Sequence, residues 1–337
     1  MKRADIRAIA YSLPDSAVTN EMLSQEHPAW DMRRVMARTG VATRYIARPD
    51  ETAFDLACRA SDLLLADHPE ARDRIDAILF CTQSGDYLLP ANSTLLHGYL
   101  DLREHVFAID FNLACSGFVY GLALAQSLIA AGMARDVLLV TADTYSKYVH
   151  PGDRAARTLF GDGAAATWVS SSDSERGLID VSCATSGKDH DLFIIPAGGC
   201  RMPRSAETSV AKADLTGSIR SLEHIHMDGS GVLRFVESTV PPQVRAVLQR
   251  NDLTMDEIDL VIFHQASKVT IDSLCRLLDV PHERSFTNLR DVGNTVSASI
   301  PIAFKDATDQ GRLRPGDRVL LCGFGVGMSW ATAILQT

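Results

Sequence analysis

Two pairs of similar segments, about half a chain length apart, place the strongest constraint on the fold of this 337-residue sequence. The run IDAILFCTQS at 75–84 resembles the run IDLVIFHQAS at 258–267, and Val137 in RDVLLV corresponds to Val319 in DRVLLC. The first pair is offset by 183 residues and the second by 182. Each run is short and apolar, as buried strands of α/β proteins are. The nearly equal offsets predict two similar α/β halves packed closely together.

Composition excludes several classes of protein. Hydrophobic residues make up 46% of the chain, which is enough for a large core. The formal charge of −9 argues against general nucleic-acid binding, because phosphate contacts need a basic face. The seven cysteines are dispersed without a C-x-x-C pair, so we expect free thiols in a reducing cytoplasm. No metal site is predicted, since His224 and His226 lack an indicated third ligand.

The chain divides into an N-terminal half, residues 1–170, and a C-terminal half, residues 178–337, joined by a polar connector at 171–177. Residues 111–134 carry no formal charge and exceed the ~20 residues needed to cross a bilayer. Polar residues of a strand-to-helix turn lie within this stretch, which favours a buried central helix over a membrane span. Residues 197–218 are weakly periodic and predict a loop over an active site or an interface.

The N-terminus predicts no secretory signal. The charged residues Lys2, Arg3, Asp5 and Arg7 interrupt the start of the chain before any long apolar run, whereas a signal peptide needs a continuous apolar core. We therefore expect a cytoplasmic protein.

Cys115 is the candidate nucleophile. It lies where the apolar run 106–110 turns through 111–114 into a helix that begins near 116–118. The N-terminus of a helix stabilises a thiolate over a thiol, so its position favours a lowered pKa for Cys115. The same backbone N–H groups offer donors for an oxyanion. The alternative is a small buried hydrophobic residue, which is the usual environment of a free cysteine.

His264 and Asn294 are candidate partners of Cys115. His264 ends the apolar run 261–263, and Asn294 follows a glycine turn. Residues at the carboxyl ends of strands in α/β sheets gather in the ligand crevice. The offset between the halves also puts Cys115 and Asn294 in roughly equivalent turns. We therefore predict an active site between the two halves.

Six short motifs resemble those of the β-ketoacyl-acyl carrier protein synthase III family, in the order in which that family has them. They are RTGV at 38–41, LACSGF at 113–118, LFGDGA at 159–164, HQAS at 264–267, GNTVSASIP at 293–301 and FGVG at 324–327. The similarity runs essentially from end to end. It implies an α/β, thiolase-like fold in which duplicated βαβαβαββ halves form a five-layered α-β-α-β-α architecture. It also implies a homodimer.

The resemblance implies a decarboxylative Claisen condensation in fatty-acid or specialised acyl biosynthesis. Cys115 would take an acyl group from an acyl-coenzyme A or acyl-carrier thioester, with the backbone N–H groups of Cys115 and Val326 as oxyanion donors. A malonyl thioester would then lose carbon dioxide, and His264 and Asn294 would stabilise the enolate. Coenzyme A or acyl carrier protein phosphopantetheine thioesters are therefore expected as substrates, with no permanently bound cofactor.

A basic patch is the candidate site for these carriers. Residues 32–48 contain five arginines and no acidic residue, in an acidic chain. A solvated helix face is the alternative reading. The resemblance points to Arg38 and Arg154 as coenzyme A or acyl carrier protein contacts, because phosphates and acidic surfaces bind basic groups.

The chain departs from the family at several of the positions that the resemblance identifies. Arg34 stands where the family often has an aromatic residue, Ser267 replaces an asparagine, and Val269 replaces a basic residue. Arg34 and Ser267 are still predicted to lie at the carrier site. Leu89 occupies the position of the acyl-tunnel gate, where a residue smaller than an aromatic one would admit a longer or branched acyl chain.

Two other functions remain open from the sequence. The first is acyl transfer to an alcohol or amine without decarboxylation, as some relatives of the family perform. The second is a non-catalytic partner subunit, which the presence of Cys115, His264 and Asn294 disfavours. A papain-like protease is disfavoured because the sequence context of its cysteine is absent.

Overall fold

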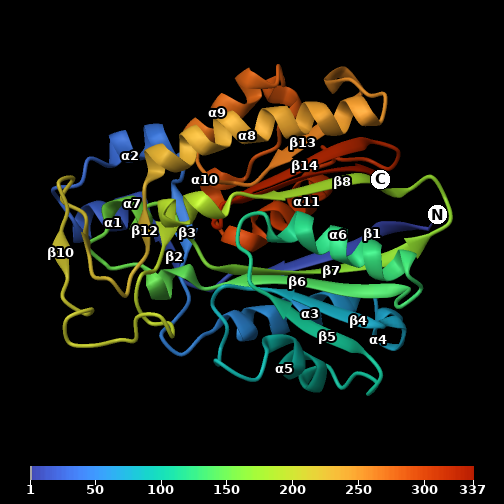
Figure 1. Cartoon of the computed structure of the whole chain (residues 1–337), viewed down its shortest axis with the longest axis horizontal. Coiled ribbons are helices and arrows are strands. Elements are labelled where there is room, and N and C mark those ends of the chain that lie inside the picture. Colours follow the sequence, from blue (N-terminus) through green and yellow to red (C-terminus); the bar gives the residue numbers. More distant parts are fainter. Residues whose placement is uncertain (1) are drawn as a thin grey trace.

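Two β-sheets, one above the other, form the framework of the computed structural model, which describes residues 2–337 (Figure 1). The first sheet has the strand order β1 (Arg3–Ser12), β7 (Gly163–Ser172), β6 (Asp136–Asp143), β4 (Ala77–Cys81) and β5 (Phe107–Phe111). The second has the order β13 (Leu260–Phe263), β14 (Arg318–Gly325), β15 (Ser329–Gln336) and β8 (Gly177–Thr185).

Helices separate the sheets and cover both outer faces (Figure 1). Between the sheets lie α6 (Gly117–Ala130) and α11 (Ser299–Asp309). The first sheet is covered by α3 (Ala53–Asp67) and α5 (Asn92–Tyr99), and the second by α8 (Gly229–Arg250) and α9 (Lys268–Leu277). The five layers predicted from the sequence are confirmed.

The duplicated segments form equivalent pairs of strands. In the first sheet β4 runs parallel to β6, with Ala77 opposite Val137. In the second sheet β13 runs parallel to β14, with Leu260 opposite Val319. The offsets of 183 and 182 residues convert the first pair of residues into the second. The halves therefore share the register of their central strands, as the repeated sequence predicts.

The uncharged stretch around α6 is the buried central helix that was predicted. Its side chains pack against strands of both sheets, and residues such as Phe118, Val119 and Leu122 are fully buried. Across residues 2–337, no helix has both the length and the apolarity needed to span a bilayer.

The remaining elements are short and gather mostly at one end of the molecule. The short strands are β2 (Ala17–Thr19), β3 (Thr43–Tyr45), β9 (Phe193–Ile194), β10 (Lys212–Ala213), β11 (Ile219–Arg220) and β12 (His226–Met227). The short α-helices are α1 (Asn20–Glu26), α2 (Met32–Thr39), α4 (Ala71–Arg74), α7 (Arg154–Arg157) and α10 (Leu289–Val292). Five 3₁₀ turns lie at Tyr145–Tyr148, Gly187–Leu192, Met255–Glu257, His282–Arg284 and Val296–Ala298.

The segment at 197–218 contains only one short strand, β10, and most of its residues are exposed. Its role as a cover or interface loop stays a prediction. So does the division of the chain at 171–177, where β7 of the first sheet ends at Ser172 and β8 of the second begins at Gly177.

We expect Gly121→Ala to lower the free energy of unfolding by about 1–3 kcal/mol, because the added methyl group overpacks the core. A Cβ atom there would lie 2.4 Å from Cδ1 of Leu139, where α6 packs on β6. Gly98→Ala in α5 is the matched control, since its Cβ would meet nothing within 4 Å. Alanine is the better helix former by about 1 kcal/mol, so this variant should be stabilised. Urea denaturation measures both, and equal effects would contradict the packing argument.

Candidate active site

Cys115 lies in the turn between β5 and α6, and two glycines of β14 make room for it. Its side chain is only 4% exposed. A Cβ atom on Gly325 of β14 would lie 2.8 Å from its Sγ atom, and one on Gly323 would lie 2.7 Å from its carbonyl oxygen. A Cβ atom on Gly117 would lie 2.2 Å from Sγ of the neighbouring Cys81. The second half of the chain thus packs directly against the candidate nucleophile.

The pKa of Cys115 differs in direction from the sequence prediction. Burial raises the pKa of this thiol well above its ordinary value, and the nearby carboxyl group of Asp143 raises it further. The backbone N–H groups of Cys115 itself and of Val326 hydrogen-bond to the thiol and lower its pKa in part. The predicted lowering by the helix N-terminus was therefore wrong in net effect, because desolvation of a buried thiolate outweighs these donors. Cys115 is a thiol at neutral pH.

His264 follows β13 and is 2% exposed. Its Nδ1 atom lies 2.6 Å from Oγ of Ser299, and its ring stands edge-on to Phe324 with the centroids 5.6 Å apart. Burial lowers the pKa of His264 to about 3. The imidazole is therefore neutral at physiological pH, and one of its two ring nitrogens carries a proton.

Asn294 has its amide orientation set by the backbone. Its Oδ1 atom accepts a hydrogen bond from the N–H group of Val296 at 3.0 Å, which leaves Nδ2 as a donor. Nδ2 donates to the carbonyl of Ala266 at 3.3 Å and lies 3.5 Å from Nε2 of His264. Two side-chain nitrogens from different elements therefore converge on one region.

The three candidate residues meet around the carboxyl end of β14. The backbone N–H of His264 donates to the carbonyl of Cys322, which lies one residue before Gly323 and three residues before Gly325. These are the two glycines that pack on Cys115. Asn294 forms an isolated parallel bridge with Phe160, which shares an apolar cluster with Cys115. The structure thus brings together the strand ends that carry Cys115, His264 and Asn294.

Sequence reasoning missed three buried side chains of this region: Asp143, Ser297 and Ser299. Asp143 ends β6 and accepts hydrogen bonds from Oγ of Ser297 at 2.5 Å and from the N–H of Gln83 at 2.9 Å. Asp143 thereby ties the segment after Asn294 to the first half of the chain. Its position at the carboxyl end of a strand was a usable signal, because the same rule identified His264.

The buried carboxyl group predicts a pH-dependent stability. Burial raises the pKa of Asp143 to about 7, from 3.8 in a model compound. Between these values the folded protein holds one proton more than the unfolded chain, so the contribution of Asp143 to stability falls as the pH rises. Asp143→Asn cannot titrate. We expect its stability relative to the parent to increase by about 1.4 kcal/mol per pH unit from about pH 4 to 7 and then to level off.

Urea denaturation of both proteins at several pH values measures this difference. Asp173→Asn is the control, because the Asp173 side chain is 82% exposed. A pH-independent difference between Asp143→Asn and the parent would contradict the raised pKa.

Family models match two long regions of the chain. The model for 3-oxoacyl-[acyl-carrier-protein (ACP)] synthase III matches residues 109–187, and that for the C-terminal region of the same synthase matches residues 248–337. The β-ketoacyl-[acyl-carrier-protein] synthase III of Campylobacter curvus is 35% identical, covering 100% of this chain and 97% of the relative. The chain belongs to the β-ketoacyl-[acyl-carrier-protein] synthase III family. The family predicted from the sequence is confirmed, and with it the prediction of a condensing, acyltransferase-type enzyme.

Further relatives agree with this assignment. The Pseudomonas aeruginosa synthase III is 36% identical, covering 96% of this chain and 93% of the relative. A crystal structure of a 3-oxoacyl-(acyl-carrier-protein) synthase III is 40% identical and covers 99% of this chain and 100% of its own, with a TM-score of 0.97. The predicted thiolase-like fold is therefore confirmed.

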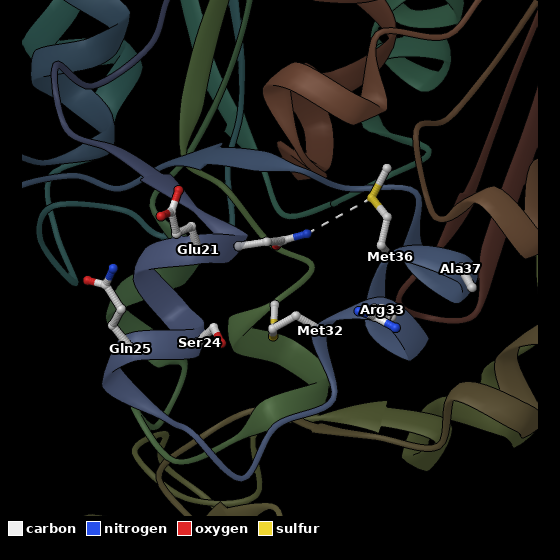
Figure 2. Close-up of a pocket in the computed structure, with 8 residues that line it drawn as sticks. Glu21, Ser24, Gln25, Met32, Arg33, Met36 and Ala37 are labelled. Carbon is white, nitrogen blue, oxygen red and sulfur yellow. Dashed lines mark hydrogen bonds between the residues drawn. The ribbon is translucent and has the colours of Figure 1, made fainter.

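Of the five arginines in the predicted basic patch at 32–48, only three lie on α2. Arg44 is fully buried, and Arg48 forms ion pairs with acidic side chains, so the patch is smaller than predicted. Arg34 and Arg38 are exposed, as is Arg33, and none of the three forms an ion pair with another described residue. Figure 2 shows an open groove between α1 and α2, with Arg33 at its edge and Met32 and Met36 among its lining residues. The α2 helix thus offers unpaired positive charge beside an apolar groove.

The other candidate carrier residues have partners within the chain. Arg154 begins α7, and its Nη2 atom donates to the carbonyl of Thr216 at 3.3 Å. Ser267 caps α9, because its Oγ atom accepts a hydrogen bond from the N–H of Thr270 at 3.3 Å. Leu89, which was predicted to line the acyl tunnel rather than to bind the carrier, lies in the loop before α5 and is 83% exposed.

The described residues offer no group of three or more His, Cys, Asp or Glu side chains arranged to hold a metal ion. His224 instead contacts the ring of His150, with the centroids 5.0 Å apart, and its Nδ1 atom lies 2.8 Å from Oγ of Ser221.

Proposed function

We propose that this family member joins an acyl group held on Cys115 to a malonyl thioester, with loss of carbon dioxide, to give a β-ketoacyl thioester. The convergence of Nε2 of His264 and Nδ2 of Asn294, 3.5 Å apart in a buried site, is the observation that carries the proposal. Two neutral donors facing one region suit an enolate oxygen, which carries the charge that develops during decarboxylation.

The first half-reaction is acylation of Cys115. The thiol sulfur attacks the carbonyl carbon of an acyl thioester, and the bond between that carbon and the carrier sulfur breaks. The carrier leaves as a thiol, with the proton that Cys115 gives up. The N–H groups of Cys115 and Val326, which already point at the sulfur, are the proposed donors to the oxygen of the tetrahedral intermediate. Because the pKa of Cys115 is raised, attack and loss of its proton are coupled.

The second half-reaction begins when the malonyl thioester loses carbon dioxide. The electron pair of the broken carbon–carbon bond forms an enolate, whose oxygen accepts hydrogen bonds from His264 and Asn294. The enolate carbon then attacks the carbonyl carbon of the acyl-Cys115 thioester, and the carbon–sulfur bond breaks. Cys115 leaves as a thiolate and takes up one proton from the solvent, which restores the thiol. A neutral His264 acts here as a hydrogen-bond donor, consistent with its lowered pKa.

Coenzyme A and acyl carrier protein phosphopantetheine thioesters are the proposed substrates, and the protein itself is proposed to be a cytoplasmic homodimer. The strand β5 is an edge strand whose Phe107 is 39% exposed, and Leu88 and Leu89 project from a nearby loop. Open strand edges and clustered apolar side chains favour association. All seven cysteines are free, which suits a reducing compartment.

The test supplies an acyl thioester and a carboxyl-labelled malonyl thioester, and measures labelled carbon dioxide and the product mass. Condensation requires both, in equal amounts. Acyl transfer to an alcohol or amine would give a product without carbon dioxide. Neither signal with any acyl donor of a broad panel would contradict the proposal and favour a partner subunit.

Arg38→Glu is expected to raise the KM for a coenzyme A thioester about fivefold at low salt, because reversing an exposed charge costs about 1 kcal/mol of attraction to the phosphates. The increase should shrink as salt screens the interaction. Arg135→Glu is the control and should leave the KM unchanged. Arg135 is exposed and precedes the N-terminal end of β6, whereas the active site lies at the carboxyl end of that strand. Equal KM values for all three proteins would exclude Arg38 from the carrier site.

A further inference from the structure

His264 is buried and neutral, so its role depends on which ring nitrogen carries the proton. Nε2 faces Asn294, and Nδ1 faces Ser299. A proton on Nε2 makes that atom a donor toward the region of the reaction, whereas a proton on Nδ1 makes Nε2 an acceptor. The two tautomers therefore differ in whether the site can bind an oxyanion.

Asn294 cannot select the donor tautomer. Because its Oδ1 atom accepts the N–H of Val296 at 3.0 Å, it presents its NH₂ group to His264. An NH₂ group favours an unprotonated Nε2, which would accept its hydrogen bond and close the oxyanion site. The contact of 3.5 Å between the two nitrogens is long for such a bond. One hydrogen of Nδ2 is donated to the carbonyl of Ala266, so its second hydrogen and a hydrogen on Nε2 are free for a shared acceptor.

Ser299 is the hydrogen-bond partner of Nδ1, and its hydroxyl can either donate to that atom or accept from it. Its Oγ atom lies 2.6 Å from Nδ1, and both side chains are 2% exposed. Ser299 is the first residue of α11, so the hydroxyl is held by a helix that packs between the two sheets. A hydroxyl that donates to Nδ1 requires the proton of the neutral ring to be on Nε2.

We propose that Ser299 is a positioning residue that holds His264 in the tautomer with its proton on Nε2. This inference rests on the proposed function, in which Nε2–H donates to the enolate oxygen. Ser299 itself does not touch the substrate.

The backbone before Ser299 has an unusual conformation and is held in place by contacts with both halves of the chain. Val296 is buried and has a φ of 55°, a left-handed conformation that is costly for a β-branched residue. Its N–H nevertheless orients Asn294, and Ser297 is anchored on Asp143 of the other half. The residues 294–299 therefore carry one oxyanion donor and the group that sets the other.

Ser299→Ala removes the hydroxyl and is the test variant. We expect carbon dioxide release from a malonyl thioester by the acylated enzyme to fall about tenfold, the effect of losing roughly 1.4 kcal/mol of tautomer preference. Acylation of Cys115, measured by intact mass, should stay within about twofold. Ser299→Thr, which keeps a hydroxyl, should recover carbon dioxide release.

Nitrogen NMR of histidine-labelled protein reads the tautomer directly, and His264→Gln assigns the signals. In the parent protein Nε2 of His264 should be protonated and Nδ1 unprotonated, and Ser299→Ala should shift the population toward a protonated Nδ1. Ser61→Ala is the matched control, because Ser61 is a fully buried serine of α3 whose Oγ atom has no hydrogen-bond partner. It should change neither readout.

An unchanged tautomer in Ser299→Ala would overturn the proposal, as would an equal loss of acylation and decarboxylation. If the parent protein releases no carbon dioxide, the proposed function fails while the NMR spectrum still decides the role of Ser299. The two failures are therefore distinguishable.

Discussion

Replacing Cys115 by alanine is expected to abolish the formation of any covalent acyl adduct and to reduce condensation to background. The parent protein, incubated with a panel of acyl-coenzyme A and acyl-carrier thioesters, should gain the mass of one acyl group, which identifies the donor. The proposed chemistry needs a sulfur atom at this position, since alanine offers no nucleophile. Intact-mass spectrometry measures both proteins.

Cys81→Ala is the control for this experiment. Cys81 is also a buried thiol of the first half, and its Sγ atom donates to the carbonyl of Leu113 at 3.0 Å. Its pKa is raised well above the ordinary value by burial, so the two cysteines share a desolvated environment. An adduct that persists in Cys115→Ala and disappears in Cys81→Ala would identify Cys81 as the nucleophile and contradict the prediction.

The sequence was sufficient to predict the layers and the convergence of Cys115, His264 and Asn294. The layers were implied by the resemblance of six motifs to a known family. The convergence rests on patterns that are local in the chain: short apolar runs, a repeated register and polar residues directly after strands. Because the halves are duplicated, the turn before α6 and the turn before α11 occupy equivalent places, and each delivers one side chain to the same region.

The electrostatics of the site were not predictable from such patterns. A helix N-terminus after Cys115 is visible in the sequence, but the glycines of β14 that desolvate the thiol are about 200 residues away. The same holds for Ser267, which was expected at the carrier site and whose hydroxyl caps α9. Burial and side-chain partners depend on contacts between distant segments, so they require the three-dimensional structure.

His264 and Asn294 are expected to act in the second half-reaction only, so their loss should slow decarboxylation far more than acylation. We expect His264→Ala and Asn294→Ala each to slow decarboxylation of a malonyl thioester by about 10²–10³-fold, the typical loss for one oxyanion donor. Acylation should change much less, because its proposed donors are the N–H groups of Cys115 and Val326 and neither belongs to the substituted side chains.

Separately measured rates provide the test: the intact-mass time course for acylation, and labelled carbon dioxide for decarboxylation by the acylated protein. His226→Ala is the control, because His226 lies on β12 and its Nε2 atom contacts the carbonyl of Ser221, away from these donors. The long 3.5 Å contact makes a further distinction possible. If Nε2 of His264 and Nδ2 of Asn294 share one oxygen, removing both costs less than the sum of the single losses, since the second loss acts on a site that is already incomplete. Equal slowing of acylation and decarboxylation would instead mean that these residues maintain the fold of the pocket rather than stabilise the enolate.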